Sequence, residues 1–174
     1  MTTLPTDRPI RLLFVCTGNS ARSQIAETVL NRKGRGRFVA ESAGSQPAAR
    51  VNPLAIATLE AAGYVYTGHP PQGLESVVGR PWDFVITVCD RAKESCPIFP
   101  GQPVLAHWGM PDPAEVTGTD AERRRAFDDA RLTISRRIDL LLALPIEKLE
   151  RLALERKLND IAGASDPSPA TPDR

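Results

Sequence analysis

Residues 10–30 constrain the fold of this chain most, because they predict a buried strand, a polar loop and a helix in immediate succession. The run Ile-Arg-Leu-Leu-Phe-Val at 10–15 has the length and composition of a buried strand. Across residues 24–30, apolar side chains recur at helical spacing. The sequence Cys-Thr-Gly-Asn-Ser-Ala-Arg-Ser at 16–23 therefore occupies a strand-to-helix turn.

The composition of this turn is typical of an anion-binding loop. A helix N-terminus offers an anion its unpaired N–H groups and the positive end of the helix dipole. Gly18 allows close approach of the backbone, and Asn19 and Ser20 can fix the loop by hydrogen bonds. The planar guanidinium of Arg22 can hold two oxygens at once. The predicted oxyanion-binding loop comprises Thr17, Gly18, Asn19, Ser20, Ala21, Arg22 and Ser23.

Cys16 opens this loop and is the candidate nucleophile. A free thiol titrates near about 8.5, and we expect the helix field to lower the pKa of Cys16 and favour the thiolate. Ser23 can donate a hydrogen bond to the sulfur. The simpler alternative is a structural cysteine before an ordinary capped turn. A nucleotide-binding P-loop fits this loop less well, because no Gly-Lys-Ser or Gly-Lys-Thr follows the glycine.

The spacing of Cys16, Arg22 and Ser23 resembles the signature of the low-molecular-weight protein tyrosine phosphatase superfamily, a cysteine, five residues and Arg-Ser after the first strand. The resemblance implies an α/β fold with a four-stranded parallel sheet flanked by helices. Alternating predicted strands and helices agree with this class. Further strands are predicted over residues 38–44, 83–88 and 104–106, and helices over 54–62, about 119–141 and 152–161.

The chain of 174 residues, 41% of them hydrophobic, predicts one domain with a proper core. We expect a flexible N-terminus at 1–9, a phosphatase-like catalytic domain at 10–145, an additional C-terminal helix at 146–163 and a disordered tail at 164–174. The added helix, with Leu152, Leu154, Leu158 and Ile161, either packs on the domain or forms a dimer contact. A monomer is favoured.

Charge and segment lengths argue against several functions. With 22 basic and 21 acidic residues the net charge is +1, which gives no reason to expect nucleic acid or membrane surfaces as partners. No stretch is long enough to cross a bilayer, and the apolar run that follows the polar residues 1–9 is too short for a signal peptide. We therefore expect a cytoplasmic protein. The spacings of its three cysteines match no zinc template.

The other two cysteines, Cys89 and Cys96, lie seven residues apart. In a helix this spacing separates their Cα atoms by about 10.5 Å along the axis, whereas a disulfide needs roughly 4.4–6.8 Å. One hypothesis is a redox switch that is helical when reduced and unwound when oxidised. The alternative is two core cysteines on one helix face, which the same spacing permits.

The segment Cys-Asp-x-Ala-x-x-x-Cys-Pro-x-x-Pro at 89–100, followed by His-Trp-Gly at 107–109 and Asp-Pro-Ala at 112–114, resembles the arsenate reductases of this superfamily, the three-cysteine, thioredoxin-coupled type. The resemblance implies that Cys16 attacks arsenate bound by the loop and Arg22, while Asp112 protonates the departing oxygen. Cys89 then releases arsenite by forming a disulfide with Cys16. Cys96 attacks Cys89 in turn, so that a Cys89–Cys96 disulfide replaces the first one. An Asp-Pro turn without catalytic function is the simpler interpretation of Asp112.

The same resemblance implies no tightly bound cofactor and an external thiol reductant, either thioredoxin or glutaredoxin with glutathione. Some relatives bind potassium beside the loop, and Asn19, Glu27 and Ser42 match three of those ligands. The main alternative function is a low-molecular-weight protein tyrosine phosphatase that hydrolyses phosphate monoesters. Tyrosines typically follow the Asp-Pro of such phosphatases, whereas this chain has Ala114-Glu115. A noncatalytic arsenite or oxyanion sensor is a third hypothesis.

Overall fold

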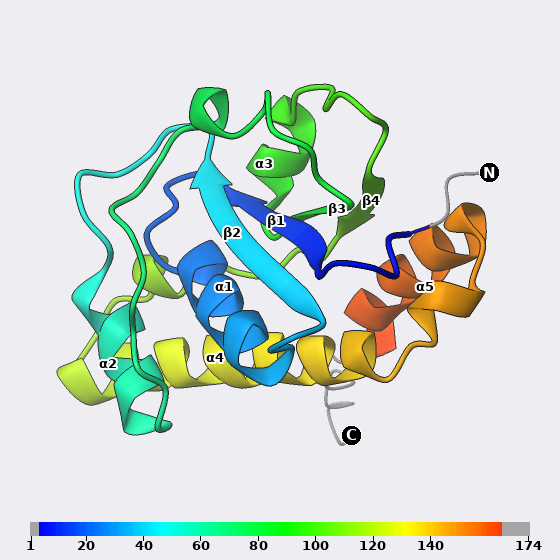
Figure 1. Cartoon of the computed structure of the whole chain (residues 1–174). Helices are drawn as coiled ribbons and strands as arrows, with labels where there is room; N and C mark the ends of the chain where they lie inside the picture. Colours follow the sequence, from blue (N-terminus) through cyan, green and yellow to red (C-terminus); the bar gives the residue numbers. More distant parts are fainter. Residues whose placement is uncertain (1–3, 165–174) are drawn as a thin grey trace, which may run out of the picture.

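Four parallel strands form the centre of the fold, in the order β2–β1–β3–β4 (Figure 1). They are β1 (Ile10–Cys16), β2 (Phe38–Gly44), β3 (Phe84–Thr87) and β4 (Val104–His107). The structure is a computed structural model that describes residues 4–164. The predicted four-stranded parallel sheet is confirmed. Residues 1–3 of the predicted flexible N-terminus and residues 165–174 of the predicted tail lie outside the described residues.

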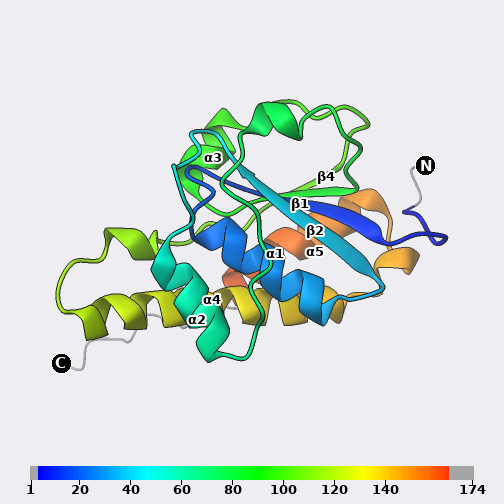
Figure 2. The same ribbon diagram turned by 60° about the vertical axis from the view of Figure 1, so that its left-hand side comes forward.

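Helices cover both faces of the sheet. In Figures 1 and 2, α1 and α4 lie against one face and α3 lies on the other, while α5 runs beside β4. The helices are α1 (Arg22–Lys33), α2 (Pro53–Ala61), α3 (Asp90–Ser95), α4 (Asp120–Leu142) and α5 (Arg151–Ala164), with short 3-10 turns η1 (Leu74–Ser76), η2 (Pro113–Glu115) and η3 (Ile146–Lys148). Each predicted strand and helix has a counterpart, and α1 begins two residues before the predicted periodic segment.

Local sequence signals explain where two helices begin. Asn52 caps α2 by accepting a hydrogen bond from the Leu54 N–H, and Pro53 occupies the first helical position. Thr119 and Glu122 form the predicted capping box at the start of α4. Both signals satisfy N–H groups that a helix end leaves unpaired.

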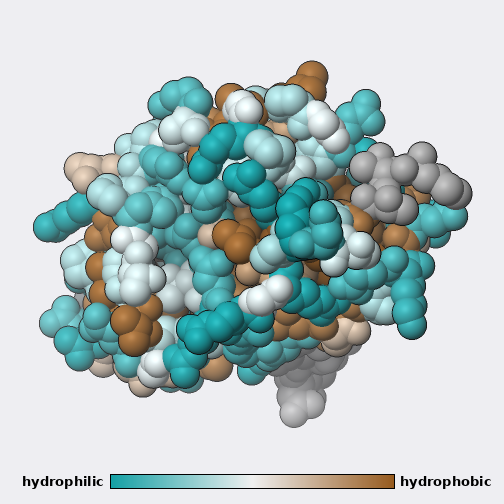
Figure 3. All heavy atoms as spheres, viewed as in Figure 1, coloured by the Kyte–Doolittle hydropathy of each residue, from teal (hydrophilic) through white to brown (hydrophobic). Residues whose placement is uncertain are grey.

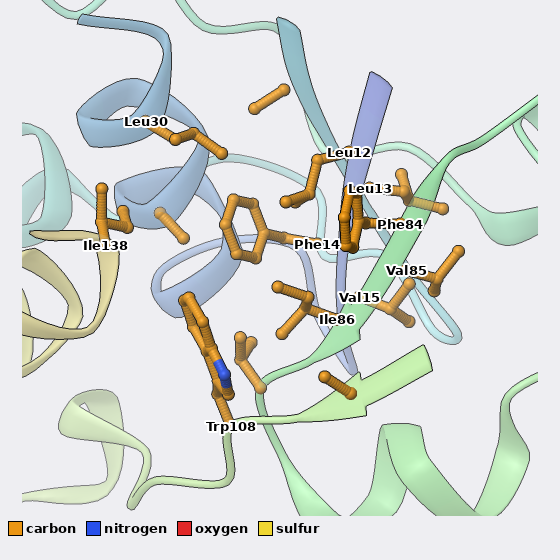
Figure 4. Close-up of a cluster of buried hydrophobic side chains, with 14 of the residues drawn as sticks. Leu12, Leu13, Phe14, Val15, Leu30, Phe84, Val85, Ile86, Trp108 and Ile138 are labelled. Atoms are coloured by element: carbon orange, nitrogen blue, oxygen red, sulfur yellow. The ribbon is translucent and has the colours of Figure 1, made fainter. Parts of the chain in front are cut away.

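The core lies between the sheet and its helices. Figure 4 shows Phe14 and Ile86 pointing from the sheet toward Trp108 and the α4 residue Ile138. The Phe14 and Trp108 rings lie 6.1 Å apart between centroids. Burying each such side chain contributes roughly 1.5–3 kcal/mol. The predicted apolar face of α4 is entirely buried; it consists of Phe127, Ala130, Ile134, Ile138 and Leu141.

The apolar face of α5 packs on the domain. Leu154, Leu158 and Ile161 are buried, whereas Leu152, predicted on the same face, is 73% exposed. The prediction for Leu152 is therefore wrong. On the side seen in Figure 3, hydrophobic side chains lie in several separate small areas among hydrophilic ones. Within residues 4–164, no helix is both long and apolar enough to span a membrane.

Candidate active site

Four side chains predicted for catalysis meet at the carboxyl edge of the sheet. Cys16 ends β1, Cys89 follows β3, Asp112 follows β4, and Arg22 begins α1. Because parallel strands end at one edge, these segments converge where open α/β sheets bind ligands. All four residues line a cavity of about 420 Å³.

The backbone of the loop after Cys16 is oriented for an anion. The carbonyls of Cys16, Thr17, Gly18 and Ser20 accept hydrogen bonds from the backbone of residues 45–52, at 2.8–3.1 Å. The Asn19 carbonyl accepts from the Gln24 side chain at 3.2 Å. In a planar trans peptide the N–H points opposite to the C=O. The loop therefore turns its carbonyls outward and its N–H groups toward the cavity, as an oxyanion requires.

Two backbone features allow this loop shape. Asn19 adopts a positive φ of 50°, which asparagine tolerates better than most residues. Gly44, at the end of β2, faces the loop so closely that a Cβ there would lie 2.9 Å from the Asn19 nitrogen and closer still to the Thr17 oxygen. A side chain at position 44 would therefore push against the loop backbone.

The Cys16 sulfur lies within hydrogen-bonding distance of two groups. The Ser23 hydroxyl is 2.8 Å away, and the Asn19 N–H donates to the sulfur at 3.1 Å. Burial raises the pKa of the Cys16 thiol, although these hydrogen bonds and the charge of Arg22 act to lower it. The predicted net lowering is wrong, because the residue is only 2% exposed and desolvation of a thiolate outweighs its neighbours.

Arg22 and Asp112 form an ion pair in the lining of the cavity. The guanidinium donates to the Met110 carbonyl at 2.9 Å and lies 3.5 Å from the Asp112 carboxylate. Asp112 also caps η2 by accepting from the Ala114 N–H at 2.9 Å. The simple turn role of Asp112 is therefore present, and the same carboxyl group reaches the cavity. An acid and a cation at one anion site can bind an oxyanion and protonate a leaving oxygen.

The remaining two thiols lie at opposite ends of α3. Cys89 is the N-cap of this helix and Cys96 its C-cap. The Cys89 sulfur lies 3.3 Å from the Thr17 hydroxyl, so the second thiol borders the anion loop. Cys96 is half-buried, lies outside the cavity lining, and burial raises its pKa. The structure contains no disulfide among the three cysteines, and the segment between Cys89 and Cys96 is helical.

The three residues matched to a potassium site form hydrogen bonds with one another. The Asn19 side-chain nitrogen donates to the Ser42 hydroxyl at 2.9 Å, and Ser42 donates to Glu27 at 3.2 Å. The other Glu27 oxygen lies 3.1 Å from His69 Nε2. Burial raises the pKa of Glu27, against the opposing effects of His69 and Ser42. With an N–H group directed into the cluster and both carboxylate oxygens paired, these residues do not fit a cation.

The structure also adds residues that the sequence did not single out. Asn19 and Ser23 of the predicted loop are buried behind the cavity, whereas it is also lined by Asp90, Arg91, Met110 and Glu115. Their positions depend on how the loops after β3 and β4 fold back over the sheet edge. A long-range contact of that kind leaves no local spacing signal.

Residues 11–151 match the profile of the family described as low molecular weight phosphotyrosine protein phosphatase. The chain belongs to this family, whose fold and Cys-Arg loop the structure contains. Its curated relatives within the family include a protein from Oceanobacillus iheyensis named arsenate reductase. It is 35% identical over 127 residues, which cover 73% of this chain and 91% of the relative.

Solved structures of arsenate reductases are also similar. One, an arsenate reductase in the oxidized state, has a TM-score of 0.65 and 28% identity, covering 76% of this chain and 96% of the other. A thioredoxin-dependent arsenate reductase from Corynebacterium glutamicum has a TM-score of 0.55 and 28% identity, covering 79% of this chain and 65% of the other. Each of these similarities covers about three quarters of this chain.

Proposed function

We propose that this protein is an arsenate reductase that reduces arsenate to arsenite through a relay of three thiols. One observation carries the proposal: a second thiol, Cys89, shares the cavity of the nucleophile Cys16, and a third, Cys96, follows at the other end of a short helix. Relatives named arsenate reductase support it, at 32% to 35% identity. Hydrolysis needs only the first thiol, because water completes that reaction.

The first step joins Cys16 to arsenate. The loop N–H groups and Arg22 bind the oxyanion, and the Cys16 sulfur bonds to arsenic. An arsenate hydroxyl leaves as water with a proton from Asp112, while the thiol proton passes to the bound oxyanion. The Ser23 hydroxyl and the Asn19 N–H surround the sulfur and stabilise negative charge on it during attack.

The second step reduces arsenic. The Cys89 thiolate attacks the Cys16 sulfur, so that a disulfide forms and the sulfur–arsenic bond breaks. The electron pair of that bond stays on arsenic, which changes from As(V) to As(III) and leaves as arsenite. Two thiols have then become one disulfide, which accounts for both electrons.

The third step moves the disulfide away from the anion loop. Cys96 attacks Cys89, a Cys89–Cys96 disulfide forms, and Cys16 returns to its thiolate. Because α3 separates these two cysteines, at least part of the helix must unwind. An external dithiol then reduces the new disulfide by exchange and becomes oxidised itself. We propose thioredoxin as this dithiol, supported by the thioredoxin-dependent relative.

The decisive experiment measures arsenite formation by the parent and by Cys89→Ser and Cys96→Ser, with thioredoxin or with glutaredoxin and glutathione. Cys89→Ser should abolish turnover with either reductant. Cys96→Ser should abolish turnover with thioredoxin, yet retain it with glutathione if a small thiol can reach the Cys16–Cys89 disulfide. Ser95→Ala, an exposed neighbour on the same helix, is the matched control and should behave as the parent.

Peptide mapping by mass spectrometry should also find the Cys89–Cys96 disulfide after a single turnover of the parent. Robust phosphotyrosine hydrolysis without arsenate reduction would overturn the proposal in favour of a phosphatase. Tight arsenite binding without turnover would instead favour a sensor.

A cytoplasmic location suits this chemistry, because the cytosol returns thiols to their reduced state. We also propose a monomer, since the buried residues of α5 pack against its own domain. Light scattering on the eluting protein tests this; a dimer mass would contradict it.

A further inference from the structure

Arg137, in the middle of α4, is the most deeply buried cation near the active site. The residue is 1% exposed. One guanidinium nitrogen donates to the Trp108 carbonyl at 2.8 Å and to the Gly109 carbonyl at 3.2 Å. Burying a guanidinium is costly unless its hydrogen bonds are well made, and the several N–H groups of arginine can serve more than one acceptor at once.

The two carbonyls belong to the chain segment that carries Asp112. This segment leaves β4 at His107 and lines the cavity with Met110 and Asp112. Arg22 donates to the Met110 carbonyl from the cavity side. The peptide groups at 108–110 are therefore held by two arginines, one from the anion loop and one from the helix behind it. With its backbone fixed in this way, Asp112 has little freedom to leave Arg22.

Helix α5 completes the support for this segment. The second terminal nitrogen of Arg137 donates to the Ala162 carbonyl at 3.4 Å, and the Trp108 indole donates to the Leu158 carbonyl at 2.8 Å. The His107 N–H donates to the Asn159 side chain at 2.9 Å. The family match ends at residue 151, where α5 begins. Helix α5 lies outside the matched region and therefore adds contacts to the start of the segment that carries Asp112.

We propose that Arg137 is a positioning residue for Asp112, and that α5 helps to hold it in place. The inference rests on the proposed role of Asp112 as the acid. Lysine at position 137 keeps the charge but has one nitrogen, so it cannot bind the Trp108 and Gly109 carbonyls and also reach the Ala162 carbonyl of α5 as the two terminal nitrogens of arginine do. The Trp108–Asp112 segment should then loosen, so that the acid spends less time beside the reacting oxyanion.

The test is a double-mutant cycle of Arg137→Lys and Asp112→Asn, with kcat and KM measured for arsenate reduction and for p-nitrophenyl phosphate hydrolysis. Arg137→Lys alone should lower kcat by about tenfold, with KM changed by less than about twofold. In the Asp112→Asn background the same change should have almost no further effect, because both act through one group. Arg136→Lys, an exposed neighbour on α4, is the matched control.

Equal loss of kcat in both backgrounds would overturn the proposal and leave Arg137 a purely structural residue. If Arg137→Lys fails to fold, Trp108→Phe removes the indole donor to Leu158, together with part of the buried ring volume, and should show the same dependence on Asp112, more weakly. A parent active on p-nitrophenyl phosphate but not on arsenate would refute the proposed function while the cycle still tests this inference. Absence of both activities would refute both.

Discussion

Replacing Gly44 by alanine should disable the anion loop, because the added Cβ would lie too close to the loop backbone. The added Cβ would lie 2.9 Å from the Asn19 nitrogen, whereas ordinary contacts begin at 3.4 Å, and the Thr17 oxygen is closer still. The loop must therefore move by at least about 0.5 Å, and overpacking of this kind typically costs about 1–3 kcal/mol. Displacement also disturbs the hydrogen bond from Gln46 to the Thr17 carbonyl, which orients the loop.

Arsenate kcat/KM and thermal unfolding together report the effect of this substitution. We expect a loss of kcat/KM on the order of a hundredfold, because small misplacements of reacting groups have effects of that size. The melting temperature should fall by about 2–4 °C for each kcal/mol lost. Gly79→Ala is the control, since a Cβ there meets nothing within 4 Å. Parental kcat/KM in Gly44→Ala, or equal damage in the control, would refute the reasoning.

Three further predictions concern the nucleophile, a helix cap and cation dependence. Since burial raises the pKa of Cys16, the rate of its alkylation by iodoacetamide should increase as the pH rises beyond the ordinary thiol range. Ser23→Ala should shift this dependence of rate on pH to still higher pH, because it removes a hydrogen bond to the sulfur. A midpoint below pH 7 would contradict this prediction. Thr119→Ala should lower the free energy of unfolding by about 0.5–2 kcal/mol in denaturant titrations without changing kcat; an unchanged stability would mean that the capping box contributes nothing. Exchanging potassium for sodium in the buffer should leave turnover unchanged. A clear activation by potassium would show that the hydrogen-bonded residues around Glu27 rearrange to bind a cation.

The elements that build the sheet edge were predictable because their signals are local. Parallel strands covered on both faces read as continuous apolar runs, as residues 10–15 do. The anion loop is predictable from its composition at a strand-to-helix turn, and the cap of α4 from Thr119 and Glu122. The direction of the Cys16 pKa shift was not predictable in this way, because the burial of the thiol depends on segments distant in the sequence.

Arg137 shows a different kind of failure. It lies three residues after Ile134 and four before Leu141, so helical spacing places it on the buried face of α4. A charged residue on an otherwise apolar helix face indicates a buried cation with specific hydrogen-bond partners. A search for apolar periodicity alone overlooks it. Gly44 carried no comparable signal, because its constraint comes from a loop more than twenty residues earlier in the chain.

The outward-facing carbonyls of the anion loop affect how the family can change its chemistry. In the proposed mechanism backbone N–H groups hold the oxyanion, and hydrogen bonds from segment 45–52 to the loop carbonyls orient them. Substitutions in the segments after β3 and β4 can therefore alter the fate of the covalent intermediate without rebuilding the binding loop. One scaffold can support hydrolysis by water or reduction by a second thiol, depending on which side chain stands at a position such as that of Cys89.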